Sequence, residues 1–161
     1  MRAERSYGVV PRETLLGTSG RAFLQSLIDG EHPHPPFSRS TGIHIAAVDD
    51  GRARFVGTPS EAFFNPLGTV HGGWTSAILD SAMACAVHST LKAGEAYTSL
   101  EMKINFVRPV LPSSGELTCE GVVIHRGATI ATSEGRLVDA KGRILAHGTE
   151  TCLIFPAEGR Q

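Results

Sequence analysis

Val70-His71-Gly72-Gly73 stands directly before a long segment that is rich in Ala and Ser and free of Pro. Such a segment predicts a helix, and two glycines at its start let the backbone approach a ligand without an obstructing Cβ. The first N–H groups of a helix lack intrahelical partners and favour negative charge. An oxyanion formed during acyl transfer could therefore accept a hydrogen bond from Gly72 or Gly73, although the glycines could also serve only a tight turn into the helix.

Asp80 lies in the middle of the same predicted helix, between Ile78-Leu79 and Ala82-Met83. A carboxylate in such apolar company needs a reason, because an unpaired buried charge is costly. Asp80 follows Gly72 by eight residues, which corresponds to about 12 Å of rise on a straight helix. One helix therefore cannot bring both groups to one small ligand, and a shared site needs folding or a second subunit. A position that faces solvent or caps a loop is the alternative.

Two predicted strands precede this helix and four follow it. The predicted strands span 42–48, 52–57, 99–107, 116–125, 129–138 and 143–155, and the long helix spans 72–91. Three hairpin turns join neighbouring strands, at Asp49-Asp50-Gly51, Arg126-Gly127 and Ala140-Lys141-Gly142. This order predicts an α+β fold in which an antiparallel sheet wraps around one long central helix. A lone sheet leaves a face or an edge open, so we expect it to meet another subunit.

Two further patterns concern how these elements pack. Small residues on the long helix would let a sheet approach closely, and they are Ala77, Ser81 and Ala84. In segment 99–107 the apolar residues alternate on one face, and they are Leu100, Met102, Ile104 and Phe106.

The first 40 residues contain one short amphipathic helix, predicted over 19–29 with Thr18 or Ser19 as its N-cap. His32-Pro33-His34-Pro35-Pro36 then ends the helix and predicts an extended connector. Its two histidines have no supporting ligands nearby in the sequence, so a solvated linker is a better interpretation than a metal site.

The composition is that of one globular domain. Of 161 residues, 41% are hydrophobic and 19% charged, and 15 Lys and Arg balance 16 Asp and Glu. This balance argues against a nucleic-acid or membrane partner recognised by bulk charge. No apolar run is long enough for a membrane span or a signal peptide, so we expect a cytoplasmic protein. Three separate cysteines without a CxxC pair predict reduced thiols rather than zinc or disulfides.

Residues 65–82, which read N-P-L-G-T-V-H-G-G-W-T-S-A-I-L-D-S-A, resemble the signature of the PaaI-type (phenylacetate-degradation-like) branch of the hotdog-fold acyl-CoA thioesterases. Residues 99–109 resemble the following strand of that family, and residues 142–149 resemble its last strand. The likeness extends over about residues 42–155, and its spacing from Asn65 to Gly72 to Asp80 is specific. It implies a hotdog domain over 41–156, an N-terminal extension over 1–40 and a C-terminal tail over 157–161.

This resemblance implies hydrolysis of acyl-CoA or aryl-CoA thioesters. Asp80 would act as general base on water or as direct nucleophile, and the Gly72 amide would polarise the thioester carbonyl. Asn65 would orient the water or the carboxylate, and Ser99 would assist from its strand. His71 would hold the loop by hydrogen bonding, with an accessory catalytic role as the alternative.

The resemblance also indicates how the substrate binds and how the chains assemble. The candidate residues for binding the substrate or CoA are Gly73, Trp74, Arg108, Arg126 and Gly127, and arginine suits phosphate chemically. Trp74 could equally belong to the core. CoA is part of the substrate, so no cofactor and no metal are expected. Sites in this family lie between two subunits, which would let Gly72 of one chain meet Asp80 of the other, and a homotetramer built from dimers is expected.

Two other functions stay open. A hotdog hydratase or dehydratase would carry its catalytic His directly after an N-P-L run preceded by Asp. Here Phe64 precedes the run, and His71 comes only after Gly68-Thr69-Val70. A non-catalytic acyl-CoA-binding protein on the same fold is the second alternative. The joint presence of Asn65, Gly72 and Asp80 speaks against it.

Overall fold

The computed structural model describes residues 5–157, and three short helices come first: α1 (Arg12–Leu16), α2 (Gly20–Asp29) and α3 (Pro36–Thr41). They are followed by β1 (Ile43–Asp49), β2 (Arg52–Gly57), a 3-10 turn (Glu61–Phe63), α4 (Gly72–His88) and β3 (Glu95–Phe106). The chain ends with a second 3-10 turn (Pro112–Ser114), β4 (Leu117–Arg126), β5 (Ile130–Val138) and β6 (Ile144–Pro156). The predicted tail lies outside the described residues except for Ala157.

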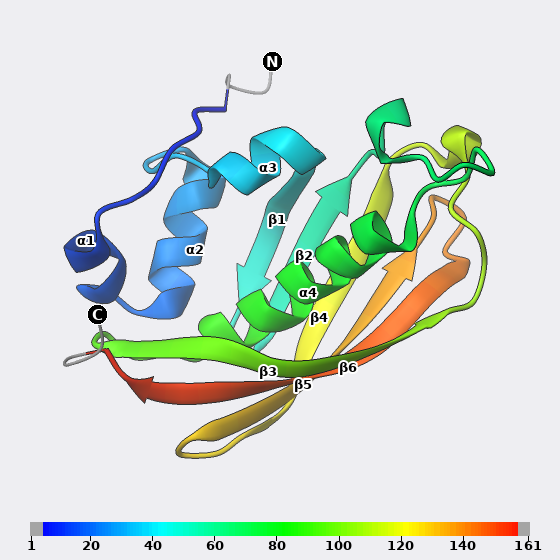
Figure 1. Ribbon diagram of the computed structural model, residues 1–161. Coiled ribbons are helices and arrows are strands. Elements are labelled where there is room, and N and C mark those ends of the chain that lie inside the picture. Colours follow the sequence, from blue (N-terminus) through cyan, green and yellow to red (C-terminus); the bar gives the residue numbers. More distant parts are fainter. Residues whose placement is uncertain (1–4, 158–161) are drawn as a thin grey trace.

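All six strands form one antiparallel sheet in the order β1-β2-β4-β5-β6-β3. The sheet curves around α4, which runs across its concave face (Figure 1). The predicted α+β architecture, a sheet wrapped around one long helix, is therefore confirmed. The chain leaves β1 at one edge of the sheet and β3 at the other.

A row of small residues crosses the sheet beneath α4. Its members pair in register on neighbouring strands, and they are Ala53, Gly121, Gly135 and Gly148. A Cβ on Gly121 would lie only 2.1 Å from the Ala82 carbonyl oxygen of α4. The helix backbone thus lies against strand backbone, at a separation that a side chain would prevent. The predicted small helix residues serve another purpose, because Ser81 and Ala84 line a cavity on a different side of α4.

The long helix ends at His88, three residues before the predicted end at Leu91. Ser89 and Thr90 turn their hydroxyls back onto the last carbonyl groups of the helix, with Ser89 Oγ donating to Ala86 O at 2.7 Å and Thr90 Oγ1 donating to Val87 O at 2.7 Å. Ser89 Oγ also accepts from the Gly51 N–H at 2.8 Å, which ties the helix end to the β1–β2 turn. Side-chain competition for the backbone therefore ends the helix.

Strand β3 begins at Glu95, four residues before the predicted start, because its first residues pair with the end of β6. Three of the apolar residues predicted to share one face of this strand are exposed to solvent in the single chain, namely Leu100, Met102 and Phe106. A bulge between Ser99 and Glu101 also shifts the alternation by one residue. An edge strand of twelve residues with an exposed apolar face is a surface that another chain can cover.

The N-terminal extension packs beside β1 and α4 (Figure 1). The predicted helix over 19–29 is confirmed as α2, with Ser19 as its N-cap accepting from Ala22 N at 3.3 Å. The prediction of a solvated linker was wrong for His34, whose side chain is 5% exposed. The cause is the chain start, since Gly8 N donates to His34 O at 2.9 Å and His34 N donates to Ser6 O at 3.0 Å.

Within residues 5–157, no helix has both the length and the apolar character needed to cross a membrane. Cys85, Cys119 and Cys152 are free thiols, as predicted, and the last two are buried.

We predict that Gly121→Ala destabilises the protein by about 2–3 kcal/mol or prevents folding, because its Cβ would overlap the α4 backbone, which cannot yield as a side chain can. Urea unfolding at fixed protein concentration measures the loss. Gly8→Ala is the control, since its Cβ would meet only Pro33 Cγ at 3.5 Å, and a change within about 0.5 kcal/mol is expected. Equal unfolding midpoints for both variants would contradict the backbone contact.

Candidate active site

The loop before α4 is held by Asn65. Its Oδ1 accepts from Leu67 N at 2.9 Å and from Thr69 N at 3.2 Å, and its Nδ2 donates to Thr69 Oγ1 at 2.7 Å. The backbone adds a bond from Asn65 N to Thr69 O at 2.8 Å. Every polar atom of the Asn65 side chain is thus engaged within the loop. This geometry favours a structural role for Asn65, and its predicted role in orienting water stays a prediction.

His71 caps the start of α4. Its Nδ1 accepts from the Gly73 N–H at 2.8 Å, so Nδ1 carries no proton in this arrangement. The Gly72 N–H, by contrast, donates to no group within residues 5–157. The two predicted oxyanion donors are therefore not equivalent, because the Gly73 amide is already used and the Gly72 amide is free. The predicted loop-holding contact of His71 is present.

The Gly72 amide lies at a cavity of about 250 Å³ at the start of α4. The cavity is lined by Val70, Gly72, Thr75 and residues 106–110. The Phe106 ring covers Gly72 closely, since a Cβ on this glycine would lie 3.3 Å from Phe106 Cζ. Arg108 lies on the same rim, with Nη1 donating to Ile144 O at 2.6 Å. A free backbone donor, an aromatic ring and a guanidinium thus border one hollow.

Asp80 opens onto a different cavity, of about 210 Å³. Most of its wall is apolar and comes from the N-terminal extension and from β1, with Leu24, Leu27, Phe37, Ile43 and Ile45 among the lining residues. Within residues 5–157 the Asp80 carboxylate forms no hydrogen bond or ion pair. Burial raises the pKa of Asp80 above its ordinary value. A half-buried, unpaired carboxylate in apolar surroundings is the state expected of a catalytic base or nucleophile.

The structure does not bring Gly72 and Asp80 together within one chain. Both belong to one uninterrupted helix, and the two cavities share no lining residue. The separation of about 12 Å expected from the helix rise therefore persists.

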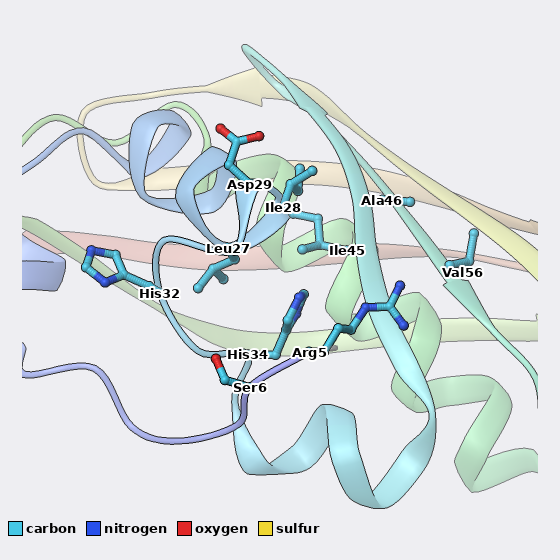
Figure 2. A pocket seen from close by; sticks show the side chains of 11 residues that line it. Arg5, Ser6, Leu27, Ile28, Asp29, His32, His34, Ile45, Ala46 and Val56 are labelled. Carbon is cyan, nitrogen blue, oxygen red and sulfur yellow. The ribbon is translucent and has the colours of Figure 1, made fainter. Parts of the chain in front are cut away.

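A third cavity, of about 360 Å³, lies beneath the chain start and is shown in Figure 2. It shares Leu27, His34 and Ile45 with the Asp80 cavity, so the His34 side chain borders both cavities. Burial, and then the charge of Arg5, lowers the pKa of His34, which favours the neutral ring. The N-terminal extension thus closes the Asp80 cavity with apolar and uncharged groups.

Ser99 meets a buried carboxylate that sequence reasoning did not single out. Ser99 Oγ donates to Oε1 of Glu150 on β6, and Cys152 Sγ lies 3.6 Å from the same oxygen. The Glu150 side chain is 1% exposed, and its Oε2 has no hydrogen-bond partner within residues 5–157. Burial, and then the nearby Asp80 charge, raises the pKa of Glu150 to about 7, against which the Ser99 hydrogen bond acts.

The charge of Asp80 opposes ionisation of the buried Glu150 side chain. Burial and this repulsion both favour the neutral form of Glu150. A carboxylate and a carboxylic acid can then occupy the same neighbourhood near neutral pH.

A signal for Glu150 existed in the sequence. In the predicted strand over 143–155, period-two alternation places Glu150 in one row with Ala146, Gly148, Cys152 and Ile154. An acid in a row of small and apolar residues is a candidate for function in the same way as Asp80. No comparable sequence pattern indicated that the N-terminal extension lines the Asp80 cavity.

The other predicted binding residues are scattered. Arg126 forms an ion pair with Glu95 at the start of β3 at 2.9 Å and also donates to Gly127 O, so both residues already have partners. Trp74 is 4% exposed and donates from Nε1 to Thr41 O at 2.9 Å, which is a core position. Of the predicted arginines, Arg108 alone borders the Gly72 cavity. Within residues 5–157, no three His, Cys, Asp or Glu side chains converge as a metal site would need.

Comparisons with known proteins agree with this architecture. A family model described as the thioesterase superfamily matches residues 67–146. A phenylacetic acid degradation-related protein of Ralstonia eutropha JMP134 is 31% identical with a TM-score of 0.74, and the match covers 81% of this chain and 98% of that one. The chain belongs to the thioesterase superfamily.

Two further structures share the fold at lower identity. The PaaI protein from the phenylacetic acid degradation operon of E. coli is 24% identical with a TM-score of 0.72, over 86% of this chain and 96% of that one. A hypothetical thioesterase protein of Streptococcus pneumoniae TIGR4, solved with coenzyme A, is 22% identical with a TM-score of 0.65, over 71% of this chain and 86% of that one.

Family membership confirms the predicted PaaI-type hotdog branch and the predicted class of thioester hydrolase. The family model begins at residue 67 and so includes Gly72 and Asp80, whereas Asn65 and helices α1–α3 lie outside it. The wall of the Asp80 cavity is therefore built largely from residues that precede this match.

We predict that Glu150 makes the stability of this thioesterase depend on pH. Because its pKa is about 7 in the folded chain and 4.5 for the unperturbed group, the unfolded chain releases this proton first as pH rises. Stability should be highest below about pH 4.5 and fall through the window up to about pH 7, by about 3 kcal/mol relative to Glu150→Gln. Urea unfolding of both proteins at matched pH values and concentrations measures the difference. Parallel stability curves from pH 4.5 to 8 would show that Glu150 ionises normally.

Proposed function

We propose that this protein hydrolyses acyl-CoA thioesters in a site built from two subunits, with the Gly72 amide of one chain and Asp80 of the other. The observation that carries the proposal is the free Gly72 N–H at the start of α4, which borders a cavity while its neighbour Gly73 is capped by His71. Thioester hydrolysis needs one donor for the developing oxyanion and one base or nucleophile. Membership in the thioesterase superfamily supports this pairing.

In the proposed reaction the thioester carbonyl oxygen accepts a hydrogen bond from Gly72 N–H. Asp80 removes a proton from water as the water oxygen bonds to the carbonyl carbon, which gives a tetrahedral oxyanion. The oxyanion collapses, the C–S bond breaks, and the proton passes from Asp80 to the leaving thiolate. Water and thioester thus become free acid and CoA thiol. Direct attack by Asp80, followed by hydrolysis of the mixed anhydride, uses the same two groups.

The edge strand β3 supports sharing of the site. Its Phe106 covers Gly72 at one end, and its Ser99 bonds to Glu150 near Asp80 at the other end. Antiparallel pairing of two β3 strands, centred between Met102 and Lys103, would set Ser99 of one chain opposite Phe106 of the other. The Gly72 hollow of each chain would then face the Asp80 region of its partner. The pairing would also cover the exposed apolar side chains of the edge.

CoA is proposed to enter at the Gly72 cavity. Arg108 borders this cavity with a guanidinium that suits a phosphate group. Arg126 is already paired with Glu95, so it would contribute only if a phosphate replaced that carboxylate. The Streptococcus pneumoniae relative, which was solved with coenzyme A, supports CoA as the carrier. The acyl group would enter the apolar Asp80 cavity, and a tetramer of two such dimers stays a prediction from the resemblance.

We predict that Asp80→Asn lowers the rate of thiol release by at least about 100-fold, because the amide can neither accept the water proton nor act as nucleophile. Purified protein is assayed with a panel of acyl-CoA and aryl-CoA esters. Asp49→Asn, an exposed residue at the end of β1, is the matched control and should retain full activity. Bound CoA ester without thiol release by the wild type would favour the non-catalytic binding protein. Water addition to an enoyl-CoA in place of hydrolysis would favour the hydratase.

A second prediction isolates the Gly72 amide. Gly72→Pro removes only this N–H at the first helical position, where His71 already has the extended backbone (φ −61°, ψ 138°) that precedes proline. We expect a loss of about 100- to 1000-fold in kcat, the usual effect of deleting an oxyanion donor. Gly72→Ala is the matched control, because it keeps the N–H and adds the same Cβ beside Phe106. Equal losses for both variants would assign the effect to the Cβ.

Mixing the Gly72→Pro and Asp80→Asn chains tests whether the site is shared. Each mixed dimer would contain one site with both groups intact, so equal mixing after subunit exchange should restore about one quarter of wild-type activity. A mixture that stays inactive, with exchange confirmed by mass spectrometry, would place both groups in the same chain's site.

A further inference from the structure

The buried carboxyl group of Glu150 accepts a hydrogen bond from Ser99, the serine predicted to assist catalysis, and its contacts indicate a role in the reaction. Glu150 belongs to the row of β6 that faces α4, and its strand neighbours in that row are Gly148 and Cys152. In a strand without a bulge, residues an odd number apart point to opposite faces. Ser99 and Met102 of a regular β3 could therefore not both lie on the same sheet face as Glu150. The bulge between Ser99 and Glu101 makes this possible by pairing Ser99 with Cys152 and Met102 with Glu150.

The hydrogen bond between the two side chains has a fixed direction. A serine hydroxyl has one proton to donate and lone pairs with which to accept. The Ser99 hydroxyl donates its hydrogen bond to Glu150 Oε1, an oxygen that can only accept when it carries no proton. The Ser99 oxygen, which lies on an exposed part of β3, is then left with acceptor capacity alone.

The other oxygen of Glu150 is unusual for a purely structural contact. Oε2 is buried and bonds to no group within residues 5–157. A buried polar atom without a partner costs free energy, which is tolerated most often where function needs it. A proton on Oε2 would keep the group neutral beside the charge of Asp80 and would leave Oε1 free to accept from Ser99.

We infer that Glu150 is a positioning residue, whose Oε1 accepts the hydrogen bond of the Ser99 hydroxyl and so leaves the Ser99 oxygen to accept a hydrogen bond from the attacking water. This inference rests on the proposed thioester hydrolysis and extends it to a residue behind Asp80 and Ser99. The water would then have two acceptors, the Asp80 carboxylate and the Ser99 oxygen, and two protons to offer them. Its oxygen lone pair would be directed away from both, toward the carbonyl carbon.

The ionisable groups around Glu150 are consistent with a neutral acid at this position. Asp80 and Cys85 of α4, Glu101 and Tyr97 of β3 and Cys152 of β6 are the titratable groups in its surroundings, and β5 contributes the uncharged Ser133. No cation is among them. Burial raises the pKa of Cys85 and of Cys152 to about 12, so both thiols stay neutral as well. Ionisation of Glu150 would add a second negative charge where an oxyanion must form.

The test compares Glu150→Gln, Glu150→Leu and Ser99→Ala with wild type in the thiol-release assay from pH 5 to 9. Gln keeps a neutral acceptor for Ser99, so its kcat at pH 6 should stay within about threefold of wild type and its activity should not decline above pH 7. Leu removes the acceptor, so kcat should fall by about 30-fold or more with KM changed less than threefold. Glu120→Gln, which removes an exposed carboxylate from β4, is the control.

The double variant Ser99→Ala with Glu150→Leu should be no slower than the slower single variant, because both substitutions remove the same Ser99–Glu150 hydrogen bond. Multiplied losses, or a Glu150→Leu enzyme as fast as wild type, would overturn the inference. If Glu150→Leu does not fold, the pH profile of Glu150→Gln decides, and an alkaline decline identical to wild type would overturn it.

Carbon-13 NMR titration of the Glu150 carboxyl group separates this inference from the proposed function, because it needs no activity. Ser99→Ala should raise the Glu150 pKa, since the hydroxyl bond favours the ionised form, and Asp80→Asn should lower it, since a repelling charge is lost. A wild-type protein that releases no thiol but shows both shifts would refute the proposed function while keeping the Ser99–Glu150 link. An unchanged pKa in Ser99→Ala would refute the link itself.

Discussion

The close approach of α4 to the sheet determines where every candidate group lies. A helix normally rests on side chains, but here the Ala82 carbonyl lies directly over Gly121, within a row of residues that have small side chains or none. Backbone against backbone leaves little freedom to slide or rotate, because interiors are packed at crystal-like density. The start of α4 is therefore fixed beside Phe106, and its middle is fixed where the charge of Asp80 acts on Glu150.

The same helix separates two electrostatic environments. At its start, a free backbone amide and a guanidinium border one hollow, which suits an anion. At its middle, a carboxylate lies under apolar side chains of the N-terminal extension, with a second carboxyl group held neutral nearby. The Gly72 amide, which suits an anion, and the Asp80 carboxylate are thus kept about two helical turns apart in one chain. The proposed pairing of two chains would bring them to one substrate.

Much of this arrangement could be predicted from the sequence, because it depends on local patterns. The alternation of the strands, the glycines before α4 and the isolated Asp80 all carry periodic or compositional signals. Features that depend on contacts across the fold could not be predicted. His34 is buried because residues 6–8 form hydrogen bonds with its backbone. The Ser99 hydroxyl contacts Glu150 because of a bulge in β3 that no residue in the sequence indicates. The sequence did place Glu150 in a row of small and apolar residues. That pattern indicates a function only once its neighbours Ser99 and Asp80 are known.

The contact between His71 and Gly73 has a consequence for the end of the reaction. With the Gly73 amide capped by His71, the Gly72 N–H is the free amide at the start of α4, beside the hollow. In the proposed reaction, the tetrahedral intermediate concentrates its charge on one oxygen and is matched by this one amide. A carboxylate product spreads its charge over two oxygens, of which the helix start can bond only one. The cap on Gly73 would therefore limit how tightly the backbone at the helix start holds the acid product.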